Sequence, residues 1–345
     1  MGHYSVIIVG AGLAGIMAAK KFSEKSVKYL VLDKGKSVGG RMATRRVNGG
    51  RSDHGAQFFT ARSEQMKALV KEWEKAGLIH TWTNGFHQMN NVTELNSLSL
   101  HNDGYPRYAG KNGMNALMKE LAQDVNIKVD HKVERMEWIE DKWSVIVRKG
   151  KEAELISFTA DQLLLTSPTP QSLELIERVK VEGNIKEDLK ATSYFPCLCA
   201  IVALDAPTNI PKPGGIQIKE GVVSFLGDNQ QKGISDTTVV TIHGNEYWSR
   251  EHYDQEDEVI IEKLIQAAKP LLGEGEILEK QLKRWRYSKP EALHPDELVA
   301  TTIPGPIAFA GDIFKRGAVE GAILSGLAAS DWMLHRNDQP SSANN

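Results

Sequence analysis

The sequence predicts an α/β protein of two domains, in which an α+β domain is inserted into a domain built on a parallel sheet. Three observations support this prediction. An apolar, β-branched run at Tyr4–Val9 leads directly into the glycine motif Gly10–Gly15, and a helical pattern follows. A second strand ending in glycine, Ile307–Gly311, lies near the other end of the chain. Short strand patterns between the two motifs are separated by turns. Strands that alternate with helices indicate a parallel sheet, and consecutive short strands indicate an antiparallel meander.

The bulk composition is that of a globular chain large enough for two domains. It has 345 residues, of which 41% are hydrophobic and 25% charged, enough to bury two cores. The net charge of −2 argues against a nucleic-acid-binding surface. The longest apolar run, Ser5–Ala19, is too short and too glycine-rich to span a bilayer. No basic segment precedes it, as one would in a signal peptide. We therefore expect a cytoplasmic protein with no nucleic-acid or membrane partner.

Two cysteines, Cys197 and Cys199, are the only ones in the chain. So few cysteines argue against a secreted disulfide scaffold and for a reducing compartment. Cys197-Leu198-Cys199 could in principle bind a metal ion, but no second Cys or His pair lies near it in sequence. We therefore expect buried, unreactive strand thiols and no metal site.

Residues 4–33 predict a strand, a helix over 13–24 and a second strand, with the glycines in the first turn. Gly10 allows the tight turn, Gly12 lets a pyrophosphate approach the backbone, and Gly15 lets the helix pack on the strand. The phosphates would meet free N–H groups at the helix N-terminus. Asp33 ends the second strand, where it can accept from a ribose hydroxyl and repel a 2′-phosphate. The segment therefore predicts a dinucleotide site that disfavours NADP.

Two further segments suggest backbone close to this ligand. Gly39-Gly40-Arg41-Met42 combines a close approach with a cation near the phosphates; the alternative is a simple turn with a solvated arginine. Asp53–Phe59 places small residues beside polar ones, which is typical of backbone packed against a flat ligand.

The C-terminal motif suggests the second end of a long cofactor. Gly311-Asp312 follows the strand Ile307–Ala310, and Asp312 could bond ribityl hydroxyls. A helix with many small residues then begins near Val319 or Glu320 and runs to about Leu334. Its N-terminal dipole would favour negative charge on a reduced flavin. FAD is long enough to need this second strand-to-helix turn, so the two motifs together predict a Rossmann-like FAD-binding domain.

The middle of the chain predicts the antiparallel crossover meander and the second domain. Short strands are expected around 133–139, 142–148 and 153–158, and Leu163–Thr166 returns to the parallel sheet. We expect a discontinuous FAD-binding domain and an inserted substrate domain, with the active site between them. The FAD-binding domain would comprise residues 1–60, 104–168 and 281–345, and the substrate domain residues 61–103 and 169–280.

Taken together, these motifs resemble the flavin amine-oxidase superfamily over nearly the whole chain. Within it the chain resembles the renalase branch in four segments, Gly55–Phe58, Tyr247–Ser249, Trp285–Tyr287 and Glu320–Gly326. Superfamily members with covalent flavin attach it through a cysteine near the C-terminal motif, and this chain has none after Cys199. The resemblance therefore implies non-covalent FAD.

The motifs and the resemblance together suggest which residues contact the cofactor. They place the turn around Ala14 at the pyrophosphate, Asp33 at the adenosine ribose, Val133 at the adenine, and Gln57 and Phe58 beside the flavin. The full predicted set is Gly10, Gly12, Leu13, Ala14, Gly15, Asp33, Lys34, Gly40, Arg41, Gln57, Phe58, Val133, Gly311, Asp312, Glu320, Gly321 and Ala322.

The resemblance also implies an activity. Renalase-type enzymes oxidise 2- and 6-dihydro isomers of β-NAD(P)H to NAD(P)⁺, passing a hydride to flavin N5 and then electrons to O₂, which gives H₂O₂. The flavin performs the electron transfer, so no catalytic side chain is assigned. Aromatic residues could stack on a flat substrate ring, although each could equally be a core residue. The candidates are Phe58, Tyr194, His243, Trp285 and Tyr287.

Other activities stay open at this point. A flavin amine oxidase would act on an amine, and a desaturase-like FAD oxidoreductase on an isoprenoid. A nucleotide-binding sensor without turnover is a further alternative. No second glycine fingerprint suggests a separate NADPH site, which makes O₂ the simplest electron acceptor. The oligomeric state is left open.

Overall fold

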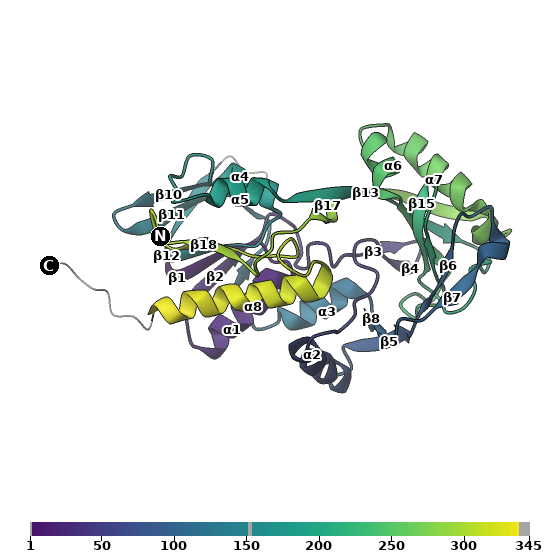
Figure 1. The fold of residues 1–345 in the computed structure, drawn as a ribbon, viewed down its shortest axis with the longest axis horizontal. Helices are drawn as coiled ribbons and strands as arrows, with labels where there is room; N and C mark the ends of the chain where they lie inside the picture. Colours follow the sequence, from purple (N-terminus) through teal and green to yellow (C-terminus); the bar gives the residue numbers. More distant parts are fainter. Residues whose placement is uncertain (1, 151–153, 338–345) are drawn as a thin grey trace. The chain divides into compact units, whose positions relative to one another are not determined.

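The computed structural model describes residues 2–150 and 154–337, and its contacts divide the chain into two compact units. The first unit comprises Met1–Gly40, Leu121–Ser193 and Pro290–Asn345, and the second Arg41–Glu120 and Tyr194–Lys289. Figure 1 colours the ribbon along the sequence, so both units are seen to combine distant segments of the chain. The protein is a mixed α/β fold with a Rossmann-like domain.

The division differs from the expected domain boundaries in four segments. Residues 41–60, 104–120 and 281–289 belong to the second unit, and 169–193 to the first. The reason is packing that sequence proximity does not reveal. The hairpin within 41–60 packs on a strand of the second sheet, whereas the helices within 169–193 pack on strands of the first.

The first unit is built on an eight-stranded sheet. Its main path runs β10-β11-β12-β1-β2-β9, and β19 joins β12 on one side and β18 on the other. β1 pairs in parallel with both β2 and β12, whereas β10 and β11 form an antiparallel meander with the start of β12. The strands are β1 (Gly2–Val9), β2 (Tyr29–Leu32), β9 (Ile127–Lys128), β10 (His131–Ile139), β11 (Lys142–Lys149), β12 (Leu155–Leu165), β18 (Val299–Thr301) and β19 (Ile307–Phe309).

Strand β12 corrects the prediction of two separate strands at 153–158 and 163–166. The structure has one strand, whose first half pairs with β11 and whose last residues pair with β19; residue 153 lies outside the described residues. Asp161 and Gln162 stand between the two predicted strands. Gln162 is instead buried within the strand, and its side-chain amide donates to the carbonyl of Met333.

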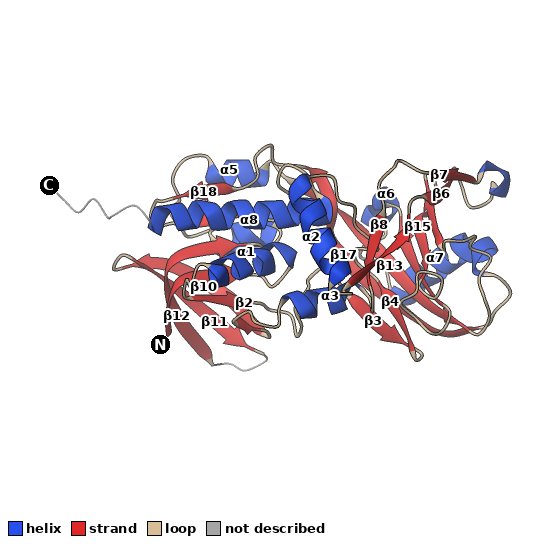
Figure 2. Ribbon diagram, turned by 90° about the horizontal axis from the view of Figure 1, so that it is seen from below, coloured by secondary structure: helices blue, strands red, loops and turns tan. Residues whose placement is uncertain are grey.

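Two helices of the first unit connect the glycine motifs at the two chain ends. α1 (Leu13–Glu24) and α8 (Ala318–Asn337) pack against each other, and Figure 1 and Figure 2 show them side by side. α8 ends at Asn337, which is beyond the predicted end at about Leu334. The short helices α4 (Thr169–Leu175) and α5 (Ile185–Lys190) pack on β10 and β18 respectively.

The second unit contains a seven-stranded sheet in the order β17-β13-β16-β15-β14-β6-β7. Figure 2 draws the strands in red and labels β13, β15 and helix α7 (Asp257–Leu272) of this unit. Helix α7 covers one face through a core that includes Leu198 and Val202 of β13. Side chains alternate along a strand, so Cys197 and Cys199 point to the other face, where Val47 of a hairpin packs on them. Both thiols are buried and lie in β13, which confirms the prediction that the two cysteines are buried strand residues. The strands are β6 (Phe86–Met89), β7 (Ser99–His101), β13 (Ser193–Leu204), β14 (Gly215–Ile218), β15 (Val223–Asp228), β16 (Val239–Gly244) and β17 (Ile277–Ala292).

Two small sheets and four short helical elements complete the second unit. The hairpin β3–β4 packs on β16, and β5 pairs with β8. These elements are β3 (Thr44–Val47), β4 (Gly50–Asp53), β5 (Ile79–Thr83), β8 (Arg107–Gly110), α2 (Glu64–Lys75), the 3₁₀ turn η1 (Leu95–Ser97), α3 (Met114–Leu121) and α6 (Glu246–Glu251). None of the described helices is both long and apolar enough to cross a bilayer.

Candidate functional site

The turn from β1 to α1 has the geometry that a phosphate-binding glycine turn requires. A Cβ atom added at Gly15 would stand 2.0 Å from the carbonyl oxygen of Gly10, so helix and strand approach too closely for any side chain there. A Cβ added at Gly12 would meet no atom within 4 Å. Gly12 precedes the first helical residue and has no side chain to cap the helix. The turn thus combines one packed glycine with one that borders open space, where a ligand group could approach.

Asp33 organises this turn from the end of β2. Its carboxylate accepts hydrogen bonds from the backbone N–H groups of Ala11 and Gly35, both at 2.6 Å. Gly39 donates to the carbonyl of Ala11 at 2.9 Å, and Gly40 lies against the Cα of Gly12. The predicted nucleotide residues before position 41 therefore lie together in the first unit.

Lys34 and Val133 are less clearly placed for a cofactor contact. The exposed Lys34 ammonium donates to Gln171 at 2.8 Å. Val133 is buried in β10, next to the shift in register between Val133 and Arg135.

The C-terminal motif packs closely into the same unit. Gly311 N–H donates to Ser325 Oγ at 2.9 Å, which joins the end of β19 to α8. The side chains of Asp312 and Glu320 are both largely buried, and Glu320 lies 3.9 Å from Arg316. Gly321 and Ala322 follow Glu320 in the first turns of α8, and a Cβ added at Gly321 would stand 3.2 Å from the Arg316 backbone.

In the second unit, Arg41 is fixed by protein groups. Its guanidinium donates to the carbonyls of Tyr287 and Ser288 at 3.2 and 3.4 Å and lies 5.5 Å from the ring centre of Tyr194. The rings of Tyr194 and Tyr287 meet edge to face at 5.7 Å. Two of the five predicted substrate residues are thus grouped around Arg41.

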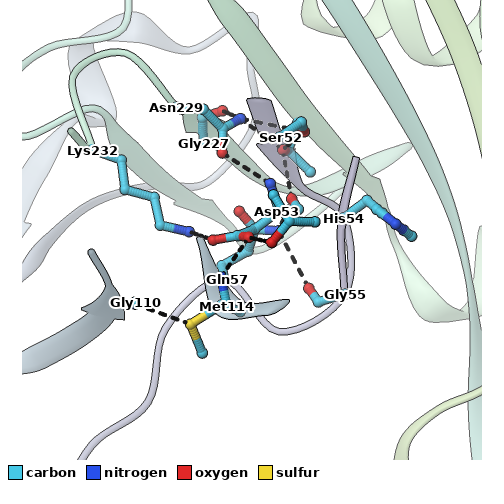
Figure 3. A network of polar contacts seen from close by, with 12 residues as sticks. Ser52, Asp53, His54, Gly55, Gln57, Gly110, Met114, Gly227, Asn229 and Lys232 are labelled. Atoms are coloured by element: carbon cyan, nitrogen blue, oxygen red, sulfur yellow. Dashed lines mark hydrogen bonds and ion pairs between the residues drawn. The ribbon is translucent and has the colours of Figure 1, made fainter. Parts of the chain in front are cut away.

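Asp53 is the centre of a buried polar network (Figure 3). Its carboxylate accepts from Lys232 Nζ at 2.6 Å, Thr44 Oγ1 at 2.5 Å and Met114 N at 2.8 Å. The Asp53 and Lys232 side chains are both 0% exposed. Burial lowers the pKa of Lys232, and the adjacent carboxylate opposes that shift. Lys232 could not be recognised from the sequence, because its partner lies 179 residues away and no local pattern marks it.

Gln57 takes its orientation from the same segment. Its Nε2 donates to the carbonyls of Asp53 and Gly55, at 2.5 and 3.2 Å. Its Oε1 is buried and has no hydrogen-bond partner among the described residues. Buried polar atoms are nearly always paired, so this oxygen is a candidate acceptor for a ligand.

The other three predicted substrate residues, Phe58, His243 and Trp285, lie in what we call the aromatic layer. It consists of the rings of Phe58, Trp82, Phe86, Phe225 and His243 and the stacked rings of His54 and Trp285, and the carbonyl group of His54 joins the two groups. The ring centre of Phe58 lies 4.9 Å from that of Phe86 and 6.3 Å from that of Phe225. The ring centres of Phe225 and His243 are 6.2 Å apart. His243 Nε2 lies 3.3 Å from the carbonyl oxygen of His54.

Trp285 reaches the same carbonyl from β17. Its Nε1 donates to His54 O at 2.8 Å, and its ring stacks on the His54 ring at 5.3 Å. Sequence analysis missed His54, Trp82, Phe86 and Phe225 as members of this layer, although His54 stands in a motif that it had singled out.

The layer carries neutral imidazoles beside cations. Burial, with the charges of Lys283, His243 and Arg45, lowers the pKa of His54 to about 3. Burial also lowers the pKa of His243 to about 4. The pKa of Lys283 is itself lowered by burial and by Arg45. Among the described residues, no carboxylate forms an ion pair with Lys283.

Comparison with known families matches almost the whole chain. Residues 8–73 match the NAD(P)-binding Rossmann-like domain, and residues 78–334 match the flavin containing amine oxidoreductase family.

Curated relatives match only in part. A Mycobacterium tuberculosis protein named as a flavin-containing monoamine oxidase, AofH, is 37% identical over 67 residues, which is 19% of this chain and 15% of that protein. The Oryza sativa lysine-specific histone demethylase 1 homolog 3 is 46% identical over 48 residues, which is 14% of this chain and 6% of that protein. The matched segment thus covers well under a fifth of either relative.

Solved structures show the same fold over the whole chain. One named as a protoporphyrinogen oxidase, from Exiguobacterium sp. 255-15, superposes with a TM-score of 0.71 at 12% identity, over 97% of this chain and 99% of that one. Wild-type putrescine oxidase bound to putrescine gives a TM-score of 0.69 at 13% identity, with the same coverage. The family match over residues 78–334 covers most of the chain, so the chain belongs to the flavin-containing amine oxidoreductase family.

Proposed function

We propose that the protein is a renalase-like oxidase that converts 2- and 6-dihydro isomers of β-NAD(P)H to NAD(P)⁺. FAD held by the Gly12 turn and Gln57 would supply an acceptor for the substrate's hydride at N5 and a two-electron donor to O₂. The H₂O₂ formed would take one proton from the transferred hydride and one from solvent. The chain's own residues bind, orient and shield the reactants. A dihydropyridine ring needs alignment rather than a strong base, so no catalytic side chain is assigned.

The residues present fit FAD on two independent observations. Gly12 borders open space at the start of α1, as a pyrophosphate site requires. Gln57 offers a buried acceptor without a partner, which suits an N–H group of a flavin ring. With no cysteine after Cys199, we propose that the FAD is held without a covalent bond. The predicted contacts of Asp33, Gly311, Asp312 and Glu320 with FAD belong to the same proposal.

The charges beside the aromatic layer are the reason that we propose a dihydro-NAD isomer, and not an amine, as the substrate. Trp285 stacks on a neutral His54, a surface that suits a flat nicotinamide ring. Lys283 and Arg45 lie near enough that the Arg45 charge lowers the Lys283 pKa. The buried carboxylate of Asp53 is already paired with Lys232. With two cations, and Asp257 as the carboxylate that opposes them at Lys283, we infer that this surface favours a ligand that carries phosphates over an ammonium ion.

Amine oxidation is the second candidate, and the comparisons favour it. The matched family is described as amine oxidoreductases, and the M. tuberculosis relative is named a monoamine oxidase. The aromatic rings of Phe58, Trp82 and Phe225 could surround an alkyl amine.

Product analysis separates the two candidates. We expect FAD-loaded protein, in air, to convert 6-dihydro-NAD to NAD⁺ with one H₂O₂ per turnover and to produce no aldehyde from benzylamine or putrescine. Aldehyde and H₂O₂ from an amine, without oxidation of the dihydro isomers, would establish the amine oxidase instead. Turnover of neither class would contradict both.

A pair of lysine variants tests the charge argument. Lys283→Met should raise KM for 6-dihydro-NAD by roughly tenfold, the effect of losing one charge-assisted contact. It should leave KM for the matching dihydronicotinamide riboside, which has no phosphate, unchanged. Lys280→Met is the control, because Lys280 lies on the same strand but is paired with Glu258. Equal effects of the two variants would contradict a phosphate contact at Lys283.

A further inference from the structure

The orientation of the Gln57 side chain is fixed by its neighbours. Two backbone carbonyls, those of Asp53 and Gly55, face one end of the amide. A carbonyl can only accept a hydrogen bond, so that end must be Nε2 and the opposite end Oε1. The buried Oε1 of Gln57 therefore accepts a hydrogen bond from one fixed direction as long as Asp53 stays in place.

Asp53 is held on every side by polar contacts. Its backbone N–H donates to Asn229 Oδ1 at 3.2 Å, and its carbonyl accepts from Thr241 Oγ1 at 2.8 Å. Its carboxylate contacts Thr44, Met114 and Lys232, as Figure 3 shows in part. Asp53 thus joins β4 to β3, to the start of α3 and to the loop after β15. Any shift of Asp53 moves the carbonyl that orients Gln57.

Lys232 contacts one neighbour of Gln57 and one neighbour of Phe58, the two residues that we propose face the flavin. Its ammonium bonds Asp53 and lies 5.0 Å from the ring centre of Trp82. Trp82 in turn meets the Phe58 ring edge to face at 6.4 Å. A single buried cation therefore connects, through one neighbour each, to Gln57 and to Phe58.

Stability alone does not explain such a pair. Two fully buried charges must both be desolvated, and replacing a buried ion pair with apolar residues is often neutral or stabilising. What apolar residues cannot supply is a fixed hydrogen-bond direction.

We propose that Asp53 and Lys232 are positioning residues that hold the Gln57 amide and the Phe58 ring in place for the flavin. The inference rests on the proposed contact of Gln57 and Phe58 with FAD. Lys232 acts through Asp53 and Trp82, and Asp53 acts through Gln57.

The test is a double-mutant cycle between Lys232 and Gln57, read on the reduction potential of bound FAD. Potentials are measured by equilibration with a redox dye, so no substrate is needed. Lys232→Met and Gln57→Leu should each shift the potential and the visible flavin spectrum. In the double variant, the combined shift should be clearly smaller than the sum of the two single shifts, because Lys232 acts on Gln57 through Asp53 and such residues are not additive. The part of the Lys232→Met shift that remains is the part that acts through Trp82 and Phe58. Additive shifts, or no shift from Lys232→Met, would overturn the proposal.

Two further variants separate positioning from loss of stability. Leu264→Ala, in the apolar core under α7, should lower the melting temperature but leave the potential and spectrum unchanged. Asp53→Asn keeps the size of the side chain and replaces Lys232→Met if the latter does not fold; it should give the same non-additivity with Gln57→Leu. If Leu264→Ala shifted the reduction potential as much as Lys232→Met or Asp53→Asn does, Asp53 and Lys232 would have a structural role only.

The result stays separate from the substrate proposal. If the protein does not oxidise dihydro-NAD isomers, the proposed activity fails while the cycle on the potential still decides this inference. If it does oxidise them, Lys232→Met should lower kcat by roughly 10- to 100-fold, as expected for a misplacement of about 1 Å, with KM within twofold of the parent. A change in KM alone would contradict positioning of the flavin.

Discussion

Gly326 of α8 lies directly against the backbone of Ala14 in α1. A Cβ atom added at Gly326 would stand 2.3 Å from the Ala14 carbonyl oxygen. The first helix of the chain and the last are thus in backbone contact, although the two residues are separated by most of the sequence. This contact brings the two glycine motifs into one unit.

Gly326→Ala should therefore separate the two helices. The added methyl group cannot fit without a shift of α8, so we expect a loss of about 1–3 kcal/mol in the free energy of unfolding and weaker retention of FAD. Thermal unfolding and flavin content measure both. Ala328→Ser adds one atom at a half-buried position of the same helix and should change neither; equal losses in the two variants would contradict the close contact.

Gly12→Ala and Gly15→Ala should fail in different ways. Gly15→Ala places a methyl group 2.0 Å from the Gly10 carbonyl oxygen, so the apoprotein itself should lose stability. Gly12 has an ordinary φ of −76° and open space around it. Gly12→Ala should cost the apoprotein no more than about 1 kcal/mol yet weaken FAD binding at least tenfold. Titration of the two apoproteins with FAD, beside their melting curves, checks this; normal FAD affinity in Gly12→Ala would contradict a pyrophosphate at this turn.

The two cysteines should be unreactive in the folded protein. Burial raises the pKa of Cys197 to about 12 and that of Cys199 well above its usual range, and the thiolate is the reactive form. Ellman's reagent should find no thiol in the native protein and two per chain in denaturant. Rapid labelling of the native protein would show that β13 opens.

The neutral histidines should make the fold sensitive to acid. The unfolded chain takes up a proton at His243 near pH 6.5, but the folded chain does so only near pH 4. Because the unfolded state binds more protons in this window, the free energy of unfolding falls as pH drops from about 6.5 towards 4. The shift corresponds to at most about 3 kcal/mol.

A His243→Gln variant measures that contribution. Its free energy of unfolding should vary less with pH between 6.5 and 4 than that of the parent. His335→Gln, at an exposed position of α8, should leave the pH dependence as it is. Identical slopes for the parent and His243→Gln would mean that His243 takes up its proton at the same pH in the folded and the unfolded chain.

The parts predicted from the sequence are those that local patterns determine. Gly10 and Gly15 each have a steric role within a short segment, and Gly12 leaves open space between them, so strand, turn and helix could be predicted in order. The C-terminal strand and α8 followed from the same kind of signal. FAD dependence followed from the two motifs together, and the family match agrees with it.

The parts that sequence analysis missed depend on partners far along the chain. Asp53 was recognised only as a polar residue between small ones, because its partner Lys232 is 179 residues away. The continuity of β12 through Gln162 was not predicted, since nothing local shows that Met333 accepts the hydrogen bond of this buried amide. Segment 41–60 was assigned by its neighbours in sequence, whereas packing on β16 places it in the second unit.

Anaerobic mixing of the FAD-loaded protein with 6-dihydro-NAD tests whether a dihydro isomer passes its hydride to the bound flavin. Without O₂, each hydride transferred bleaches one flavin, so the 450 nm absorbance band reports the chemical step alone. We expect bleaching within seconds by the dihydro isomer, return of the colour on admission of air, and no bleaching by benzylamine. A flavin that stays oxidised with the dihydro isomer but is bleached by the amine would contradict the proposed function.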